Sequence, residues 1–115
     1  MGYPSMTRNF RAEATATGNM DFNQQSVGFF VDVGRENIYA GDVDDWNFDV
    51  QIGGAATVKI QGNNWDPDTA ADWYDISSVT SSSIVQKGNY AAKFLRANVS
   101  SYTSGSVIVN FIGEQ

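Results

Sequence analysis

Oxygen-bearing side chains recur at regular spacing in NNWDPDTAADWYD, residues 63–75. Asn64, Asp66, Asp68 and Asp75 fall at positions one, three, five and twelve of a calcium-loop pattern. Carboxylate and amide oxygens are the ligands that a hard cation prefers. The spacing therefore makes calcium binding the first chemistry to consider.

The rest of the loop departs from that pattern. Thr69 stands where the sharp turn requires glycine, and Asp75 replaces the bidentate glutamate at the last position. Pro67 restricts the backbone, and no flanking helices are expected. We therefore expect no metal ion and no other cofactor, and interpret these carboxylates as solvated turn residues that keep the protein soluble.

Catalysis is the second chemistry to weigh. Ten aspartates could supply a pair of carboxylates for glycoside hydrolysis, but a raised carboxyl pKa needs a cleft that a small sandwich has little material to build. The chain has no histidine and no cysteine, so the usual general base, the usual zinc ligands and a thiol nucleophile are missing. The serines lack a strand–nucleophile–helix motif. We expect no enzymatic activity.

Aromatic side chains in the same segment suggest a third chemistry, which is sugar binding. Trp65, Trp73 and Tyr74 lie in or beside the loop, where exposed rings could stack on a sugar. We interpret Trp73 first as a core tryptophan on a strand, whereas Trp65 is surrounded by polar turn residues and is the better candidate. The side chains that could bind the sugar hydroxyls are Asn64, Asp66 and Asp68.

Composition narrows the possible partners. The net charge of −6 opposes binding to nucleic acid or to anionic membranes in the absence of a basic cluster, and no such cluster is found. No apolar run is long enough to span a bilayer, and the first residues lack the apolar stretch of a secretory signal. We expect a protein made in the cytoplasm, with one domain over residues 7–115 and an N-terminal arm over residues 1–6 that carries Tyr3.

Strands connected by tight turns are the elements that must position these residues. Gly, Ser, Thr and Asn are abundant, and apolar residues alternate with polar ones at the strand period of two, most clearly at residues 46–52. Strands are also predicted near residues 8–16, 26–34, 56–62, 73–76, 82–86, 94–99 and 107–112. The fold class is therefore all-β, an antiparallel sandwich of seven or eight strands.

Two of the connections look like hairpins. Gly53 and Gly54 offer the backbone freedom for a tight turn between residues 46–52 and 56–62. SYTSG places Gly105 in a second short turn before the last strand. The prediction is that each pair of strands lies side by side in one sheet.

The last two predicted strands appear apolar on both faces. One face would place five side chains in the core, namely Leu95, Val99, Val107, Val109 and Phe111. The other face would group Phe94, Ile108 and Ile112 beside Arg96. Contiguous apolar patches on a soluble domain usually mark a partner surface, although the N-terminal arm or a loop could also cover this one.

The residues YAAKFLRANVSSYTSGSVIVNFIG, preceded by VKIQG and DWYDI, carry a family resemblance. Over about residues 46–113 the pattern resembles the small β-sandwich decoration or cement proteins of tailed bacteriophage capsids. The resemblance implies a jelly-roll-like sandwich on the outer capsid surface of the virion, commonly a homotrimer, which binds the major capsid protein at subunit junctions and stabilises the head. In this interpretation Tyr3, Phe94, Arg96, Ile108 and Ile112 form the oligomer or capsid interface.

Discoidin-like carbohydrate-binding sandwiches share an arginine-bearing penultimate strand. The alternative is therefore a sugar-binding module of a phage spike or fibre, formed by Asn64, Trp65, Asp66, Asp68 and Tyr74. The two hypotheses differ in what they require. The cement protein needs an oligomer and the apolar strand face, whereas the sugar binder needs only a monomer and the exposed indole.

Overall fold

The computed structural model describes residues 7–22, 36–41, 43–86 and 92–114. The predicted arm with Tyr3 and the predicted strand at residues 26–34 lie outside these ranges. Nine strands and one 3-10 turn follow in chain order within them: β1 Thr7–Ala14, β2 Gly18–Asn19, β3 Ile38–Tyr39, β4 Asp45–Ile52, β5 Ala55–Asn63, η1 Ala70–Asp72, β6 Tyr74–Val79, β7 Ser83–Gln86, β8 Phe94–Ser104 and β9 Val107–Glu114.

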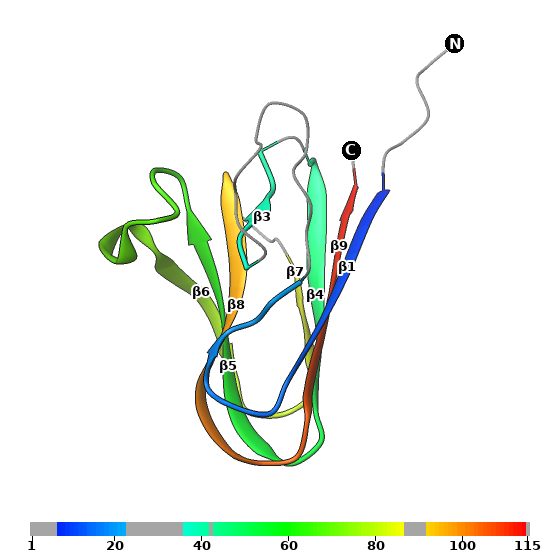
Figure 1. Ribbon diagram of the computed structural model, residues 1–115. Coiled ribbons are helices and arrows are strands. Elements are labelled where there is room, and N and C mark those ends of the chain that lie inside the picture. The colour runs from blue at the N-terminus through cyan, green and yellow to red at the C-terminus, as the bar shows by residue number, and fades with distance from the viewer. Residues whose placement is uncertain (1–6, 23–35, 42, 87–91, 115) are drawn as a thin grey trace.

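The strands form two antiparallel sheets that pack face to face (Figure 1). The first sheet has the order β1-β9-β4-β7. The second has the order β2-β8-β5-β6, with β3 pairing to β8 as well. The prediction of an all-β antiparallel sandwich is confirmed. The strands exceed the predicted seven or eight because β2 and β3 have two residues each, too few to give a periodic signal.

A long two-stranded ribbon connects the sheets. One arm of the ribbon is β4 followed by β5, and the other arm is β8 followed by β9. The arms stay paired along their length: Asp45 lies opposite Glu114 in the first sheet, and Asn63 lies opposite Phe94 in the second. Figure 1 shows both arms curving beneath the sandwich from one sheet into the other. This folded ribbon gives the sandwich its jelly-roll-like character.

The two predicted hairpins are therefore wrong, although the strands themselves form. β4 pairs with β9 and β7 rather than with β5, and β8 pairs with β5 rather than with β9. Gly53, Gly54 and Gly105 lie where the ribbon changes sheets, and the Gly53 amide still donates to the Ser106 carbonyl at 2.9 Å. Register shifts in the β5–β8 pairing beside this corner add to the bend.

The core lies between the sheets and centres on Phe48. Its ring meets Trp46 at 5.6 Å, Phe111 at 5.1 Å and Phe22 at 6.2 Å between centroids. Alternation along β4 carries Trp46, Phe48 and Val50 inward, as predicted. The five side chains predicted to fill the core from β8 and β9 are all buried, at 1% exposure or less.

Among the described residues, no helix is long and apolar enough to cross a membrane.

Candidate functional site

The apolar patch predicted on the last two strands does not exist as one surface. Phe94 belongs to β8 in the second sheet, while Ile108 and Ile112 belong to β9 in the first. The outer faces of the two sheets point in opposite directions, so the patch is divided between the two sides of the sandwich. The prediction failed because it assumed that the strands form a hairpin in one sheet.

Phe94 is also covered rather than exposed. Its side chain is 5% exposed, and the Tyr39 ring packs edge-on against it at 5.8 Å between centroids. Tyr39 lies directly opposite Phe94 in the β3–β8 pairing, and the Lys93 ammonium lies 5.6 Å from the Phe94 ring. A short strand distant in sequence therefore covers the residue that we had expected to contact a partner.

The outer face of the first sheet carries an apolar groove of about 520 Å³. Ile84 from β7 and Ile108 from β9 line it, and Asp49 and Gln51 of β4 lie between them in the pairing. Ile84 is 62% exposed, one of the two large apolar side chains most open to solvent in the described part of the chain. This groove is the best candidate for a partner-binding surface on this face.

Polar groups at one end shape the groove. Ser82 Oγ accepts a hydrogen bond from the Ile52 amide at 2.9 Å, which ties the segment before β7 to the end of β4. Ser82, Ser83 and Ser106 join the lining there. Ile112 lies four residues further along β9 than Ile108, beside a smaller hollow of about 90 Å³. The face thus presents half-exposed isoleucines within a polar frame, as the centre of a protein interface commonly does.

The outer face of the second sheet is polar and internally connected. Arg96 Nε donates to Gln61 Oε1 at 2.7 Å, and Gln61 Nε2 donates to Asp75 Oδ1 at 2.8 Å. Asp75 Oδ2 pairs with the Lys59 ammonium at 3.2 Å. The Arg96 guanidinium lies 4.0 Å over the Trp73 ring. Arg96 is therefore held in place by stacking and by a hydrogen-bonded chain of side chains across three strands.

The electrostatics of this chain follow from its contacts. The hydrogen bond from Gln61 is the largest of the effects that lower the pKa of Asp75 below its ordinary value of 3.8; Lys59 adds to it, and partial burial opposes it. Burial lowers the pKa of Arg96, and the charge of Glu36 acts against that shift.

Removing the amide tests the assigned cause. We expect Gln61→Ala to raise the pKa of Asp75 toward 3.8, as measured by NMR titration of its carboxyl carbon. Because the folded-state pKa is the lower one, the stabilisation from charged Asp75 is full above the unfolded pKa and is lost as the pH falls through the folded value. Gln86→Ala, an exposed site on the first sheet, should leave the titration unchanged. An unshifted Asp75 in Gln61→Ala would contradict the assignment.

The acidic loop after β5 is organised by its own side chains. Asn63 is fully buried, donates to the Asp66 carbonyl at 2.8 Å and accepts from the Trp65 amide at 2.7 Å. The Asp66 carboxylate accepts from the Asp68 amide and from the Thr69 hydroxyl. These oxygens therefore cap a turn, and no three acidic side chains of the described residues gather into a cation site.

The predicted sugar-binding residues are only partly brought together. Trp65 is 77% exposed and lies in the same turn as Asp68. Asn64, however, accepts a hydrogen bond from the Lys93 amide at 2.9 Å, and the Tyr74 ring packs on the Gly62 backbone. Tyr74 faces away from Asp75, its neighbour on β6, because successive strand residues point to opposite faces.

Two features of these surfaces were missed from the sequence. Ile84 was placed on a strand without being recognised as exposed, although successive residues of any strand point to opposite faces, so only one of Ile84 and Val85 can be buried in the core. No local sequence pattern predicts the stacking of Arg96 on Trp73, because the two residues are distant in sequence. The position of the indole depends on the register shift between Ile60 and Gln61 and on the path of η1, which precedes Trp73. Trp73 also donates from its ring nitrogen to the Pro67 carbonyl at 3.0 Å.

Two antiparallel sheets joined by a folded ribbon, with an apolar groove on one outer face, define an all-β sandwich. No protein-family model matches the chain, and no curated protein is similar to it in sequence. Among solved structures, the SPBc2 prophage-derived protein YomS is similar at a TM-score of 0.64 and 14% identity, over 100% of this chain and 98% of that chain. PirA aligns at a TM-score of 0.41 and 13% identity, over 95% of this chain and 93% of that one. At 14% identity the likeness to YomS shows the fold alone.

Proposed function

We propose that the protein is a non-enzymatic structural component of a phage particle, a capsid decoration or cement protein that binds where major capsid subunits meet. The fold it shares with a prophage-derived protein supports a phage origin. The absence of histidine and cysteine from the sequence supports a binding role over catalysis. On this proposal the protein acts on the outer surface of the virion after synthesis in the host.

The groove on the first sheet is the observation that carries the proposal. Ile84 and Ile108 come from different strands and line one hollow, so a partner surface that enters the hollow can contact both. Full burial of an exposed isoleucine contributes about 1.5–3 kcal/mol. Asp49 and Gln51, which lie between the two isoleucines on β4, can fix the orientation of the partner through hydrogen bonds.

Particles test this function directly. We expect Ile84→Ser with Ile108→Ser to weaken binding to heads of the encoding phage assembled without this protein by at least about tenfold, because two apolar contacts are lost. The measurement is co-sedimentation of labelled protein with the heads over a concentration series. Loss of protection of the heads against heat should accompany the loss of binding.

Two variants make the result specific. Gln86→Ser changes an exposed residue on the same strand as Ile84 and should bind as the unchanged protein does. Trp65→Ala removes the exposed indole and should also leave binding intact. Normal binding of the isoleucine variant would reject the groove, and loss with Trp65→Ala alone would favour the sugar-binding alternative.

The homotrimer is the oligomer that we propose for the capsid-bound state. Its threefold contact can no longer include Phe94, which Tyr39 covers. Ile84 and Ile108 line the groove assigned to the capsid protein, so Ile112 is the half-exposed interface residue of the first sheet that remains for it. Arg96 belongs to the opposite side of the sandwich and is engaged there with Gln61.

A further inference from the structure

The strand β1 forms a long, straight edge of the first sheet. All eight of its residues pair with β9 without a register shift, from Thr7 opposite Glu114 to Ala14 opposite Val107. The other side of β1 carries no strand among the described residues. Figure 1 shows it as the outermost strand of that sheet. Half of its backbone donors and acceptors therefore face outward, as a template for another strand.

The other sheet edges are protected in ways that β1 is not. β7 has four residues and β2 has two, and β6 is interrupted by a register shift opposite Ile60 and Gln61. Short edges and bulges are the usual devices that prevent strands of separate molecules from pairing. β1 contains neither proline nor lysine, and its inward-pointing Arg8 is buried and donates to the Tyr39 carbonyl at 3.1 Å.

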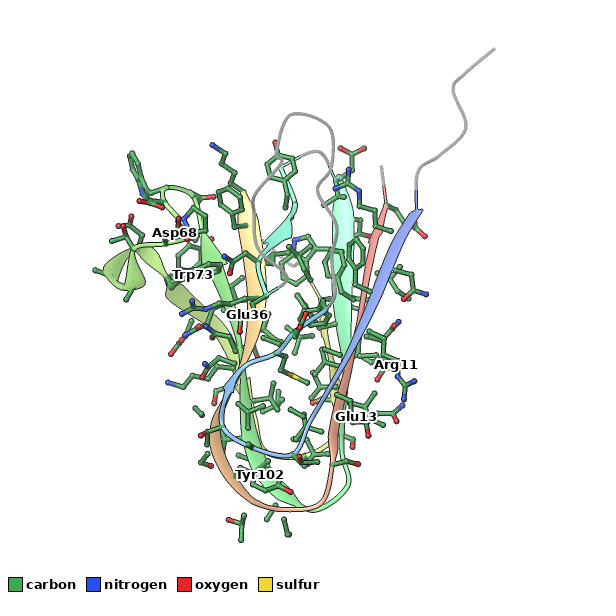
Figure 2. The ribbon with its side chains drawn as sticks, viewed as in Figure 1. Arg11, Glu13, Glu36, Asp68, Trp73 and Tyr102 are labelled. Carbon is green, nitrogen blue, oxygen red and sulfur yellow. The ribbon has the colours of Figure 1, made fainter. Side chains whose placement is uncertain are left out.

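Two opposite charges lie on the outward face of this edge. Arg11 and Glu13 are both exposed, and neither side chain makes a hydrogen bond or ion pair with another described residue. Figure 2 shows the two side chains projecting from β1 on the side away from the second sheet. Ala12 lies between them and points inward.

We propose that β1 pairs with β1 of a second copy of this chain, antiparallel and across a twofold axis at Ala12. In this register Arg11 of each copy lies opposite Glu13 of the other, which gives two symmetric pairs of opposite charge. On the inner side Phe10 lies opposite Ala14, and Ala12 lies opposite itself, so a large side chain always meets a small one. The two first sheets join into one continuous sheet.

Charge selects this register over its neighbours. A shift of the twofold axis by one residue toward the N-terminus places Arg11 opposite Arg11, and a shift the other way places Glu13 opposite Glu13. Like charges directly opposite on paired strands are destabilising. Only the Ala12-centred register, among these three, pairs every outward charge with its opposite.

A charge swap tests the pairing in solution. Native mass is measured from about 1 μM to 1 mM, because a single pair of edge strands buries little area and associates weakly. We expect the unchanged protein to pass from monomer to dimer. Glu13→Arg should raise the dimer dissociation constant at least about tenfold, because both symmetric pairs become Arg–Arg. Arg11→Glu with Glu13→Arg should restore it, because the opposite charges reappear with exchanged positions.

A matched control separates this effect from net charge. Asp68→Arg changes the charge by the same amount as Glu13→Arg, at an exposed turn that Figure 2 shows on the far side of the molecule from β1. It should leave dimerisation unchanged. The pairing is overturned if the protein stays monomeric throughout, if Glu13→Arg leaves the mass unchanged, if the double variant fails to recover dimerisation, or if Asp68→Arg weakens it equally.

The proposed edge pairing is independent of the proposed capsid groove. β1 and β7 are opposite edges of the first sheet, so a second copy on β1 leaves the groove beside β7 open. Glu13 lies opposite Ile108, which lines the groove, so Arg11→Glu is the variant that separates the two proposals: it makes both symmetric pairs Glu–Glu and lies opposite Asn110, which is not part of the groove lining. Arg11→Glu can abolish the dimer while binding to heads persists, and Ile84→Ser with Ile108→Ser can abolish binding while the dimer persists.

Discussion

Gly105→Ala is expected to destabilise the fold by more than about 3 kcal/mol, a large part of the total stability of a domain this size. Gly105 has a φ of +81°, in the left-handed region that a side chain disfavours. A Cβ there would lie 2.5 Å from the Gly54 amide nitrogen and 2.7 Å from the Gly54 Cα. Both atoms are backbone, so the two arms of the ribbon must separate at the corner. Urea unfolding followed by circular dichroism measures the loss.

Two other glycines separate the causes of that loss. Gly18 also has a positive φ, +130°, but a Cβ there would meet nothing within 4 Å, so Gly18→Ala should cost only backbone strain of about 1–2 kcal/mol. At Gly53 the nearest atom would be 3.4 Å away, so Gly53→Ala should change stability by no more than about 0.5 kcal/mol. Equal effects at Gly105 and Gly18 would show that the corner is not tightly packed.

Phe48→Ala is expected to cost about 3–5 kcal/mol, because it empties the centre of the core. Phe48 is fully buried, and its ring contacts Trp46 and Phe111 from β4 and β9 as well as Phe22, which precedes the undescribed segment. Phe10 stacks on the other side of Phe111 at 6.1 Å but is only half-buried. Phe10→Ala should therefore cost clearly less in the same urea experiment, and equal losses would contradict this view of the core.

Strand identity was predictable because it depends on local pattern. Trp46, Phe48 and Val50 alternate with polar residues, and burial of one strand face requires that alternation wherever the strand pairs. The same reasoning placed Val107, Val109 and Phe111 correctly in the core. Which face of a strand is buried can thus be read from a few residues.

Strand partners were not predictable, because pairing depends on residues that are distant in sequence and not on local pattern. Gly53, Gly54 and Gly105 supply backbone freedom, and a hairpin turn and a bend between sheets both require it. Whether the glycines form a hairpin or a bend depends on whether β4 pairs with β5 or with β9. The β9 residues that pair with β4 lie more than 50 residues away in sequence, so no local pattern reports them. The error propagated to the site, since it grouped Phe94 with Ile108.

The groove was only partly predicted from the sequence, again because strand order was not known. The half-exposed Ile108 was recognised as outward-facing, but Ile84 lies diagonally across β4 from it, opposite Asp49 rather than Gln51, on a strand predicted without any partner. Apolar residues from separate strands form a surface only after the order β9-β4-β7 is known. Trp65 was identified correctly as exposed because polar turn residues surround it.

The folded ribbon also has a consequence for how the chain folds during synthesis. β9 lies between β1 and β4 in the first sheet, yet it is translated after both of them. Residues 7–14 and 45–52 must therefore wait without their central partner until the ribosome has passed residue 114. Pairings between such distant residues close slowly, in milliseconds to seconds for β-sandwiches. During that interval the unpaired strands are open to aggregation, so the growing chain depends on being kept apart from its neighbours.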